Sequence, residues 1–255
     1  MSSPIWTPAA LSSELSAYRR RCWRAVEAQH RVSTLKLVDT LEEQRVLEAA
    51  IEAAKPSPPG ELGKLHYLLA TPFRYGAIYP KGSRFRRAGR TLGVFYASER
   101  PETAVAEMAF YRLLFYAESP ATPWPSDAGE YTVFTAAVAT QRRLDLTAAP
   151  LSRDRAAWID LIDYAACQAL ADAARAANAE VIRYASARDP AAGVNVAVLS
   201  VAAFAETEPL HPQTWRIRLS AAGVQAICAF PAKRLEFGRE AFAADPRIAA
   251  IAWER

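Results

Sequence analysis

A single carboxylate, Glu107, stands in a helical stretch whose neighbouring positions are small or aromatic. In the segment "ERPETAVAEMAFY", small side chains precede this glutamate by one helical turn, and two aromatic side chains, Phe110 and Tyr111, follow it by one turn. The face that carries Glu107 is therefore not a solvated stripe of charge. An unpaired buried carboxylate is costly, so this glutamate must meet an arginine, hydrogen-bond donors or a ligand. A structural ion pair and a functional carboxylate both fit the pattern.

Five arginines precede this helix in the segments "TPFRYG" and "GSRFRRAGR": Arg74, Arg84, Arg86, Arg87 and Arg90. A planar guanidinium beside aromatic residues suits a ligand that carries both phosphate groups and aromatic rings. A solvated basic loop explains the same residues equally well.

Ser186 closes the stretch "VIRYAS", which has the composition of a β-strand. No nucleophile elbow surrounds it and the three histidines lie in unrelated contexts, so a Ser-His-Asp triad has little support. The three cysteines form no CxxC pair, and no glycine-rich phosphate loop occurs. The sequence therefore predicts no metal site, no disulfide framework and no P-loop. A serine at this place is otherwise an ordinary strand-end hydroxyl.

Two amphipathic helices are predicted near the N-terminus. Apolar residues recur at helical spacing in one stripe over residues 15–26 and in another over residues 41–51. The proline-rich segment 55–60 ends the second helix. We therefore divide the chain into an N-terminal helical segment, residues 1–60, and a main domain, residues 61–255.

The main domain mixes short β-rich runs with helices. Helices are predicted at about 102–117, with Pro101 as the first residue, and at about 155–177. Strands are predicted at 93–98, 130–139, 142–146, 180–186, 195–200, 214–219, 224–230 and 234–238. The strands do not alternate regularly with helices, and several follow one another at the end, which favours antiparallel pairing. The predicted fold is α+β, with mixed, mainly antiparallel sheets and flanking helices.

Composition narrows the class of protein. Of the 255 residues, 51% are hydrophobic and 23% are charged, as in ordinary folded soluble proteins. The net charge of +4 is too small an excess to predict direct nucleic-acid binding. No signal peptide and no apolar run of about 18 residues is visible, so we expect a cytoplasmic protein without membrane association.

Three blocks, taken together, resemble the RES domain family, which is named for an arginine, a glutamate and a serine dispersed along the chain. The blocks are the spaced arginines of "TPFRYG" and "GSRF", the pattern Y-x-S-x-x-x-x-T-A-x-x-E at 96–107, and the strand end "YASAR". The resemblance covers roughly residues 66–205 and leaves the N-terminal segment outside it. It implies a fold related to the ADP-ribosyltransferases.

The resemblance also implies a set of site residues. It makes Arg74, Glu107 and Ser186 catalytic, and it implies that NAD is bound by Tyr75, Arg84, Tyr96 and Ser98. Phe85-Arg86 follows Arg84 where many members carry Trp-Asn, so the division of labour between Arg74 and Arg84 stays open.

Members of this family are typically toxins of bacterial toxin–antitoxin pairs that degrade NAD+. The resemblance therefore implies an NAD+ glycohydrolase that takes NAD+ as its substrate and needs no cofactor. NAD+ phosphorolysis and ADP-ribosyl transfer at the same site stay open, because only the acceptor differs. A small helix-turn-helix antitoxin is the implied partner, and a homo-oligomer is compatible with the sequence. The alternative of a different class is a non-enzymatic protein that binds a partner and whose Arg/Glu cluster is structural.

Overall fold

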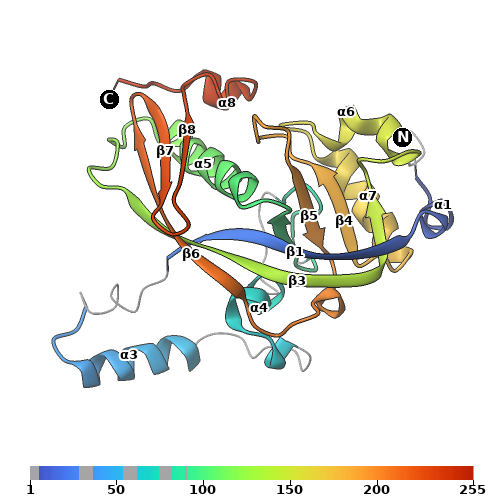
Figure 1. Cartoon of the computed structure of the whole chain (residues 1–255), viewed down its shortest axis with the longest axis horizontal. Helices are drawn as coiled ribbons and strands as arrows, with labels where there is room; N and C mark the ends of the chain where they lie inside the picture. Colours follow the sequence, from blue (N-terminus) through green and yellow to red (C-terminus); the bar gives the residue numbers. More distant parts are fainter. Residues whose placement is uncertain (1–5, 29–36, 54–61, 75–81, 90, 255) are drawn as a thin grey trace.

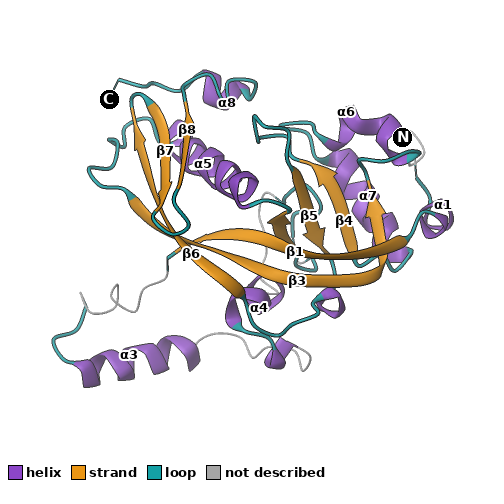
Figure 2. Cartoon of the chain, in the orientation of Figure 1, coloured by secondary structure: helices purple, strands orange, loops and turns teal. Residues whose placement is uncertain are grey.

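The computed structural model describes residues 6–28, 37–53, 62–74, 82–89 and 91–254 (Figure 1). Its centre is an eight-stranded sheet in the order β1-β2-β5-β4-β3-β6-β7-β8, in which β1 also pairs with β3 (Figure 2). Neighbouring strands are antiparallel except for β3 and β4, which are parallel. The strands are β1 (Ser16–Glu27), β2 (Phe95–Ser98), β3 (Gly129–Asp145), β4 (Val181–Ala185), β5 (Val194–Val198), β6 (Leu210–Ser220), β7 (Gly223–Cys228) and β8 (Lys233–Phe237).

Helices flank this sheet, so the fold is α+β and mainly antiparallel, as predicted. The α-helices are α1 (Pro8–Ser13), α3 (Leu41–Ala53), α4 (Tyr67–Arg74), α5 (Pro101–Glu118), α6 (Arg155–Trp158), α7 (Ala165–Ala176) and α8 (Pro246–Ala249). Short 3-10 helices occupy Leu62–Lys64, Leu151–Asp154 and Val201–Ala203. No helix in these described stretches has the length and apolar character needed to cross a membrane.

The first of the two predicted N-terminal helices is wrong, because residues 16–27 form strand β1. This strand pairs antiparallel with β3 from Ser16 to Glu27. Tyr18 and Cys22 are buried on it, four positions apart. A spacing of four fits one face of a helix and also one face of a strand, whose side chains repeat every second residue. The sheet therefore includes residues that precede position 61, whereas the second predicted helix is present as α3.

The predicted helix at 155–177 is two helices, α6 and α7, with a break between them. At the break the Asp160 carboxylate accepts the backbone N–H groups of Ile162 (2.8 Å) and Asp163 (2.7 Å). The Asp163 carboxylate in turn accepts the N–H of Ala165, at the start of α7. Aspartate side chains that bond nearby N–H groups compete with the helical pattern and favour turns and caps. Trp158 is buried at the end of α6, and Cys167 is buried in the first turn of α7.

Helix α5 begins at Pro101, as predicted, because a proline at the first helical position gives up an N–H that would have no partner there. Its buried residues, among them Val105, Phe110 and Leu113, pack with the sheet residues Trp215 and Ile217. A second core forms where α7 covers β4 and β5, around Leu170 and Ile182. Figure 1 shows the long strands β1 and β3 running beneath both groups of elements.

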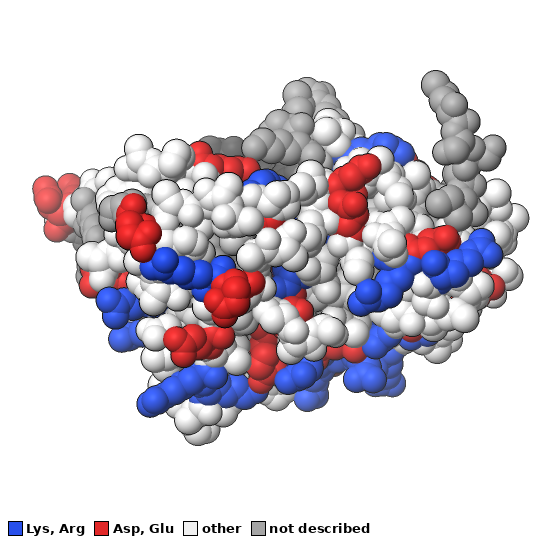
Figure 3. Space-filling view, turned by 90° about the horizontal axis from the view of Figure 1, so that it is seen from above, with Lys and Arg blue, Asp and Glu red and all other residues white. Residues whose placement is uncertain are grey.

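The surface carries charges of both signs. On the face seen from above, lysine and arginine side chains are interspersed with aspartate and glutamate (Figure 3). This is the pattern of an ordinary solvated surface.

Candidate active site

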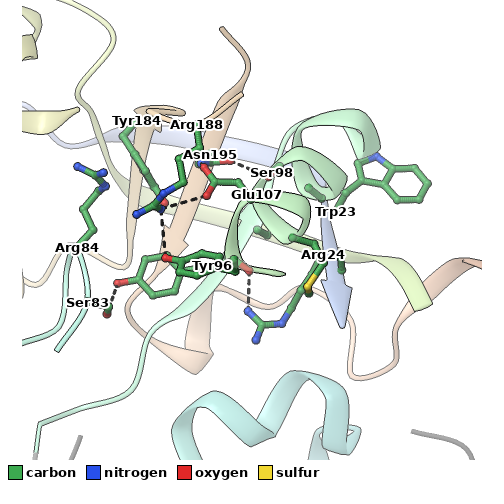
Figure 4. Close-up of a pocket in the computed structure, with 15 residues that line it drawn as sticks. Trp23, Arg24, Ser83, Arg84, Tyr96, Ser98, Glu107, Tyr184, Arg188 and Asn195 are labelled. Carbon is green, nitrogen blue, oxygen red and sulfur yellow. Dashed lines mark hydrogen bonds and ion pairs between the residues drawn. The ribbon is translucent and has the colours of Figure 1, made fainter. Parts of the chain in front are cut away.

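A cavity of about 270 Å³ lies where β1, β2, α5 and β4 meet (Figure 4). This volume is close to the lower end of the range for small-molecule sites, roughly 300 Å³. Its walls combine aromatic, apolar and charged side chains, including Trp23, Arg24, Ser83, Arg84, Tyr96, Ser98, Glu107, Met108, Tyr111, Tyr184, Arg188 and Asn195. The cavity therefore offers a carboxylate, several cations and aromatic rings in one place.

Glu107 projects from α5 into this cavity, and 19% of its side chain is exposed. Its Oε1 accepts two hydrogen bonds, from the Ser186 hydroxyl (2.7 Å) and from the Asn195 amide (2.5 Å). Its Oε2 accepts one long hydrogen bond, from Arg188 at 3.3 Å. The first oxygen is fixed in place, and the second keeps most of its capacity to accept a hydrogen bond from a ligand.

Ser186 lies just beyond β4 and is buried. Its Oγ accepts the backbone N–H groups of Arg188 (3.2 Å) and Asp189 (2.9 Å). Both contacts occupy acceptor positions of the hydroxyl, so its one proton is left to donate to Glu107. The structure therefore brings together two residues that the resemblance makes catalytic: Ser186 contacts the Glu107 carboxylate and is not one of the residues that line the cavity.

Arg188 is the cation that accompanies Glu107, and the sequence analysis did not identify it. Its guanidinium lies 4.3 Å from the ring centroid of Phe110 and donates to the hydroxyls of Tyr111 (3.2 Å) and Tyr164 (2.5 Å). Burial lowers the pKa of Arg188, but Tyr111 and Glu107 raise it more, and the pKa lies above its ordinary value. Arg188 therefore stays charged. It stands within the "YASAR" block, so the sequence did contain a signal for it.

Tyr96 and Ser98, two predicted binding residues, both line the cavity from β2. The Tyr96 hydroxyl contacts the Ser83 hydroxyl at 2.8 Å and accepts the N–H of Phe85 at 3.0 Å. Burial raises the pKa of Tyr96 to about 12, so the phenol is neutral. Ser98 donates to the Asn195 side-chain oxygen at 2.7 Å, and this turns the amide nitrogen toward the glutamate.

Arg84 lines the cavity, but its guanidinium is already engaged. It donates to the backbone carbonyls of Trp158 (2.7 Å) and Asp160 (2.8 Å) and lies over the ring of Tyr164. These bonds tie the loop that carries Arg84 to the break between α6 and α7. Arg84 thus lies at the cavity where the resemblance places an NAD-binding arginine, whereas the arginine paired with the Glu107 carboxylate is Arg188.

The other predicted arginines stand away from the cavity or outside the described chain. Arg86 donates to Thr91, and Arg87 forms an ion pair with Asp172, so neither belongs to the cavity wall. The side chain of Arg74, the whole of Tyr75 and Arg90 lie outside the described residues.

Strand β1 supplies a second cation that the sequence analysis missed. Arg24 donates to the carbonyl of Tyr96 at 2.7 Å and lies 4.8 Å from the ring centroid of Phe95. Its Nε is buried without a hydrogen-bond partner, and no described carboxylate forms an ion pair with it. Burial lowers the pKa of Arg24 to about 10, so the group is still a cation at neutral pH. A buried cation without a counterion favours the binding of an anion.

Arg24 and its neighbour Trp23 were missed because the residues around them were assigned to a helix outside the main domain. Only the pairing of β1 with β3 and β2 brings Trp23 and Arg24 to the cavity. Among the described residues, no group of three or more His, Cys, Asp or Glu side chains is arranged to hold a metal ion.

Comparison with known proteins gives a family and a structural neighbour. The sequence matches the RES domain family over residues 58–220. No curated protein matches it significantly. One solved structure, the MbcT–MbcA toxin–antitoxin complex of M. tuberculosis, aligns with 82% of this chain and 92% of that chain, at 16% sequence identity and a TM-score of 0.43.

Proposed function

This chain belongs to the RES domain family, and we propose that it is a toxin that depletes cellular NAD+ by cleaving the bond between nicotinamide and ribose. The observation that carries the proposal is the arrangement of Glu107: one oxygen is held by two donors and the other faces a cavity rich in aromatic and cationic groups.

The chemistry of the bond explains why one carboxylate suffices. Nicotinamide leaves as a neutral base, so no strong acid has to protonate it. Positive charge moves onto the ribose, as in glycoside hydrolysis. A carboxylate fixed beside that charge stabilises the transition state more than the ground state, which is the requirement for catalysis.

Glu107 fills this role in the proposal. Its Oε2 accepts a hydrogen bond from a hydroxyl of the nicotinamide ribose, while Ser186 and Asn195 hold Oε1 still. Ser186 thereby acts through the carboxylate. Arg188 balances the charge of the site before substrate arrives. Tyr96 and Tyr111 flank the nicotinamide ring, and both line the cavity.

The pyrophosphate is bound by arginine. Arg24 is the best-supported ligand, because it is a buried cation at the cavity that lacks a carboxylate partner among the described residues. Arg84 contributes positive charge to the same wall, although two carbonyls already take its hydrogen bonds. Arg74 and Tyr75 remain part of the proposal from the family resemblance alone.

Water is the acceptor that we favour, which makes the protein an NAD+ glycohydrolase. Phosphate would give a phosphorolytic reaction, and a protein side chain would give ADP-ribosyl transfer. In the described part of the chain, the two carboxylates nearest in sequence that could activate a protein acceptor are already paired: Glu99 is bound to Arg183, and Glu102 is bound to Lys233 and Arg100.

A toxin of this kind needs an inhibitor. We propose that the protein acts in the cytoplasm and that its inhibitor is a small helix-turn-helix antitoxin with an acidic segment. The cations it would meet at the cavity are Arg24, Arg84 and Arg188. Complementary charge steers such an encounter, and the aromatic wall supplies specificity.

Incubation of the purified protein with NAD+ tests the proposal. We expect release of free nicotinamide together with ADP-ribose, at a rate that does not depend on added phosphate. NADH is the matched control: its dihydronicotinamide carries no positive charge, so it leaves poorly and NADH should persist. Absence of nicotinamide from the NAD+ reaction would exclude the activity and favour the partner-binding alternative. A rate that requires phosphate would replace water by phosphate as the acceptor.

A further inference from the structure

The loop between β4 and β5, residues 186–193, carries two of the groups that contact Glu107. Ser186 donates to one oxygen of that carboxylate, and Arg188 donates to the other. The loop itself must therefore be held in place for the site to keep its geometry. A carboxylate that belongs to the loop, Asp189, does this and does not line the cavity.

Asp189 closes the loop on itself. Its Oδ1 accepts the N–H of Ala191 at 2.9 Å, and its Oδ2 accepts the N–H of Gly193 at 3.2 Å. Ala192, between these two positions, has a φ of 52°, a left-handed conformation that costs energy in a residue with a Cβ. Strain of this kind persists only where surrounding contacts impose it. Asp189 supplies such contacts, because it binds the N–H groups of the residues directly before and after Ala192.

The same carboxylate ties the loop to α5. The Thr103 hydroxyl donates to Asp189 Oδ2 at 2.7 Å, and Thr103 is fully buried in the first turn of the helix. Thr103 stands four residues before Glu107, so the two side chains lie on the same face of α5, one turn apart.

The fit between loop and helix leaves no free space. A Cβ added to Gly193 would lie 2.1 Å from Thr103 Oγ1 and 2.4 Å from Asp189 Oδ2. Only glycine allows the loop backbone to approach the helix this closely. Thr103, Asp189 and Gly193 thus contact one another, and we name this group of three residues the loop clasp.

We propose that Asp189 is a positioning residue: through the loop clasp it fixes the loop 186–193 against α5, so that Ser186 and Arg188 hold the Glu107 carboxylate in its reactive orientation. This inference rests on the proposed cleavage of NAD+. It assigns no contact between Asp189 and the substrate. Its effect must therefore appear in the rate of the chemical step and hardly in substrate binding.

The test compares Asp189→Ala with Asp189→Asn by steady-state kinetics of nicotinamide release, normalised to folded protein. Loss of the loop clasp in Asp189→Ala should lower kcat by roughly 10- to 100-fold, the scale of a small misplacement of a catalytic group, and should change KM by less than about three-fold. Asp189→Asn keeps the Oδ1 contact and can still bond Thr103, so its kcat should lie between those of Asp189→Ala and wild type. It also provides a variant with a smaller risk of misfolding.

A matched control exists elsewhere in the chain. Asp145 also accepts a backbone N–H and a threonine hydroxyl, both from Thr147, but it is not part of the cavity. Asp145→Ala should lower stability and leave the kcat of the folded enzyme unchanged. A double variant of Thr103→Val and Asp189→Ala should be no slower than Asp189→Ala alone, because both changes break the same contact.

The outcomes separate the two proposals. A wild-type kcat in folded Asp189→Ala, or a loss of kcat in Asp145→Ala as large as that in Asp189→Ala, overturns the positioning role while the cleavage activity stands. A wild-type protein that releases no nicotinamide overturns the proposed function, and the positioning role falls with it.

Discussion

Two glutamates eight residues apart, Glu99 and Glu107, each meet an arginine, yet their surroundings differ in kind. Their side chains are 12% and 19% exposed, so burial hardly distinguishes them. Arg183 binds both oxygens of Glu99, at 2.8 and 3.1 Å. Arg188 reaches only one oxygen of Glu107, at 3.3 Å. The difference lies in which acceptor positions the protein itself has filled.

The Glu99 group, which we define as Glu99, Arg183, Tyr18 and Asp145, is closed. Tyr18 donates to Glu99 at 3.1 Å, and Arg183 also donates to Asp145. Arg183 and Tyr184 are successive residues of β4, so their side chains point to opposite faces of the sheet, and only Tyr184 lines the cavity. A carboxylate is available for chemistry when one of its oxygens can still accept a hydrogen bond and that oxygen faces a cavity.

The largest effect on stability should come from Arg183→Ala. This change removes the arginine that binds both oxygens of Glu99, and it removes one of the two arginines paired with Asp145. Breaking a partly buried pair of this kind should lower the free energy of unfolding by about 2–4 kcal/mol, measured by urea denaturation. Arg188→Ala should cost less, because Ser186 and Asn195 still bond Glu107. Equal losses of unfolding free energy in Arg183→Ala and Arg188→Ala would show that the two glutamates depend on their arginines to the same extent.

Arg24→Ala should mainly affect substrate binding. Arg24 is proposed to bind the pyrophosphate in both ground and transition states, so KM for NAD+ should rise about ten-fold with little change in kcat. The loss of stability should be small, because the lost hydrogen bond to the Tyr96 carbonyl is offset by removal of a buried cation that has no carboxylate partner among the described residues. An unchanged KM would remove the assignment of Arg24 to the pyrophosphate.

Removal of one hydroxyl from each group should separate rate from stability. Ser186→Ala deletes a donor to Glu107 and should lower kcat by roughly ten-fold, with a small change in stability. Tyr18→Phe deletes a donor to Glu99 and should lower stability by about 1 kcal/mol without changing kcat. Kinetics and thermal unfolding of both variants check this. The prediction fails if the tyrosine variant is the slower enzyme.

The smallest expected effect is a change in acid stability. The pKa of Glu99 is lowered from its ordinary value of 4.5, because the hydrogen bonds and charge of Arg183 outweigh the effect of burial. The stability that this carboxylate contributes is therefore present above pH 4.5 and is lost as pH falls through its depressed pKa. Glu99→Gln should flatten the decline in unfolding free energy over that acid range. If the unfolding free energy of Glu99→Gln declines as steeply as that of wild type, other carboxylates cause the loss of stability in acid.

The sequence allowed most elements of the main domain to be predicted. Helix α5 and the strands around it have clear periodicity and a proline at the helix start, and these local signals coincide with the tertiary structure. The resemblance assigned Glu107 and Ser186 to one site, and their side chains are hydrogen-bonded although they lie 79 residues apart in the chain. These two residues meet because of the order of the strands in the sheet. A family motif that spans several segments can indicate such a contact, whereas the pattern of one segment cannot.

The errors also have physical causes. A four-residue spacing of apolar side chains fits both a helix and a strand. Because the helix was predicted, Trp23 and Arg24 were not recognised as residues of the site. The resemblance assigns Arg84 to NAD binding, and the sequence could not show that the Arg84 guanidinium is already hydrogen-bonded to the carbonyls of Trp158 and Asp160. The partner of Glu107, Arg188, follows Ser186 by two residues in a loop whose conformation depends on Asp189 and Thr103.

The most direct test of the difference between the two glutamates is nicotinamide release from NAD+ by wild type, Glu107→Gln and Glu99→Gln, each normalised to its folded fraction. The structure predicts that Glu107→Gln keeps its fold and loses roughly 100-fold or more in rate, the scale of one preorganised electrostatic group. Glu99→Gln should be less stable but should release nicotinamide within about three-fold of the wild-type rate, because it touches no residue that contacts the substrate. A Glu107→Gln protein that works at the wild-type rate would contradict the account.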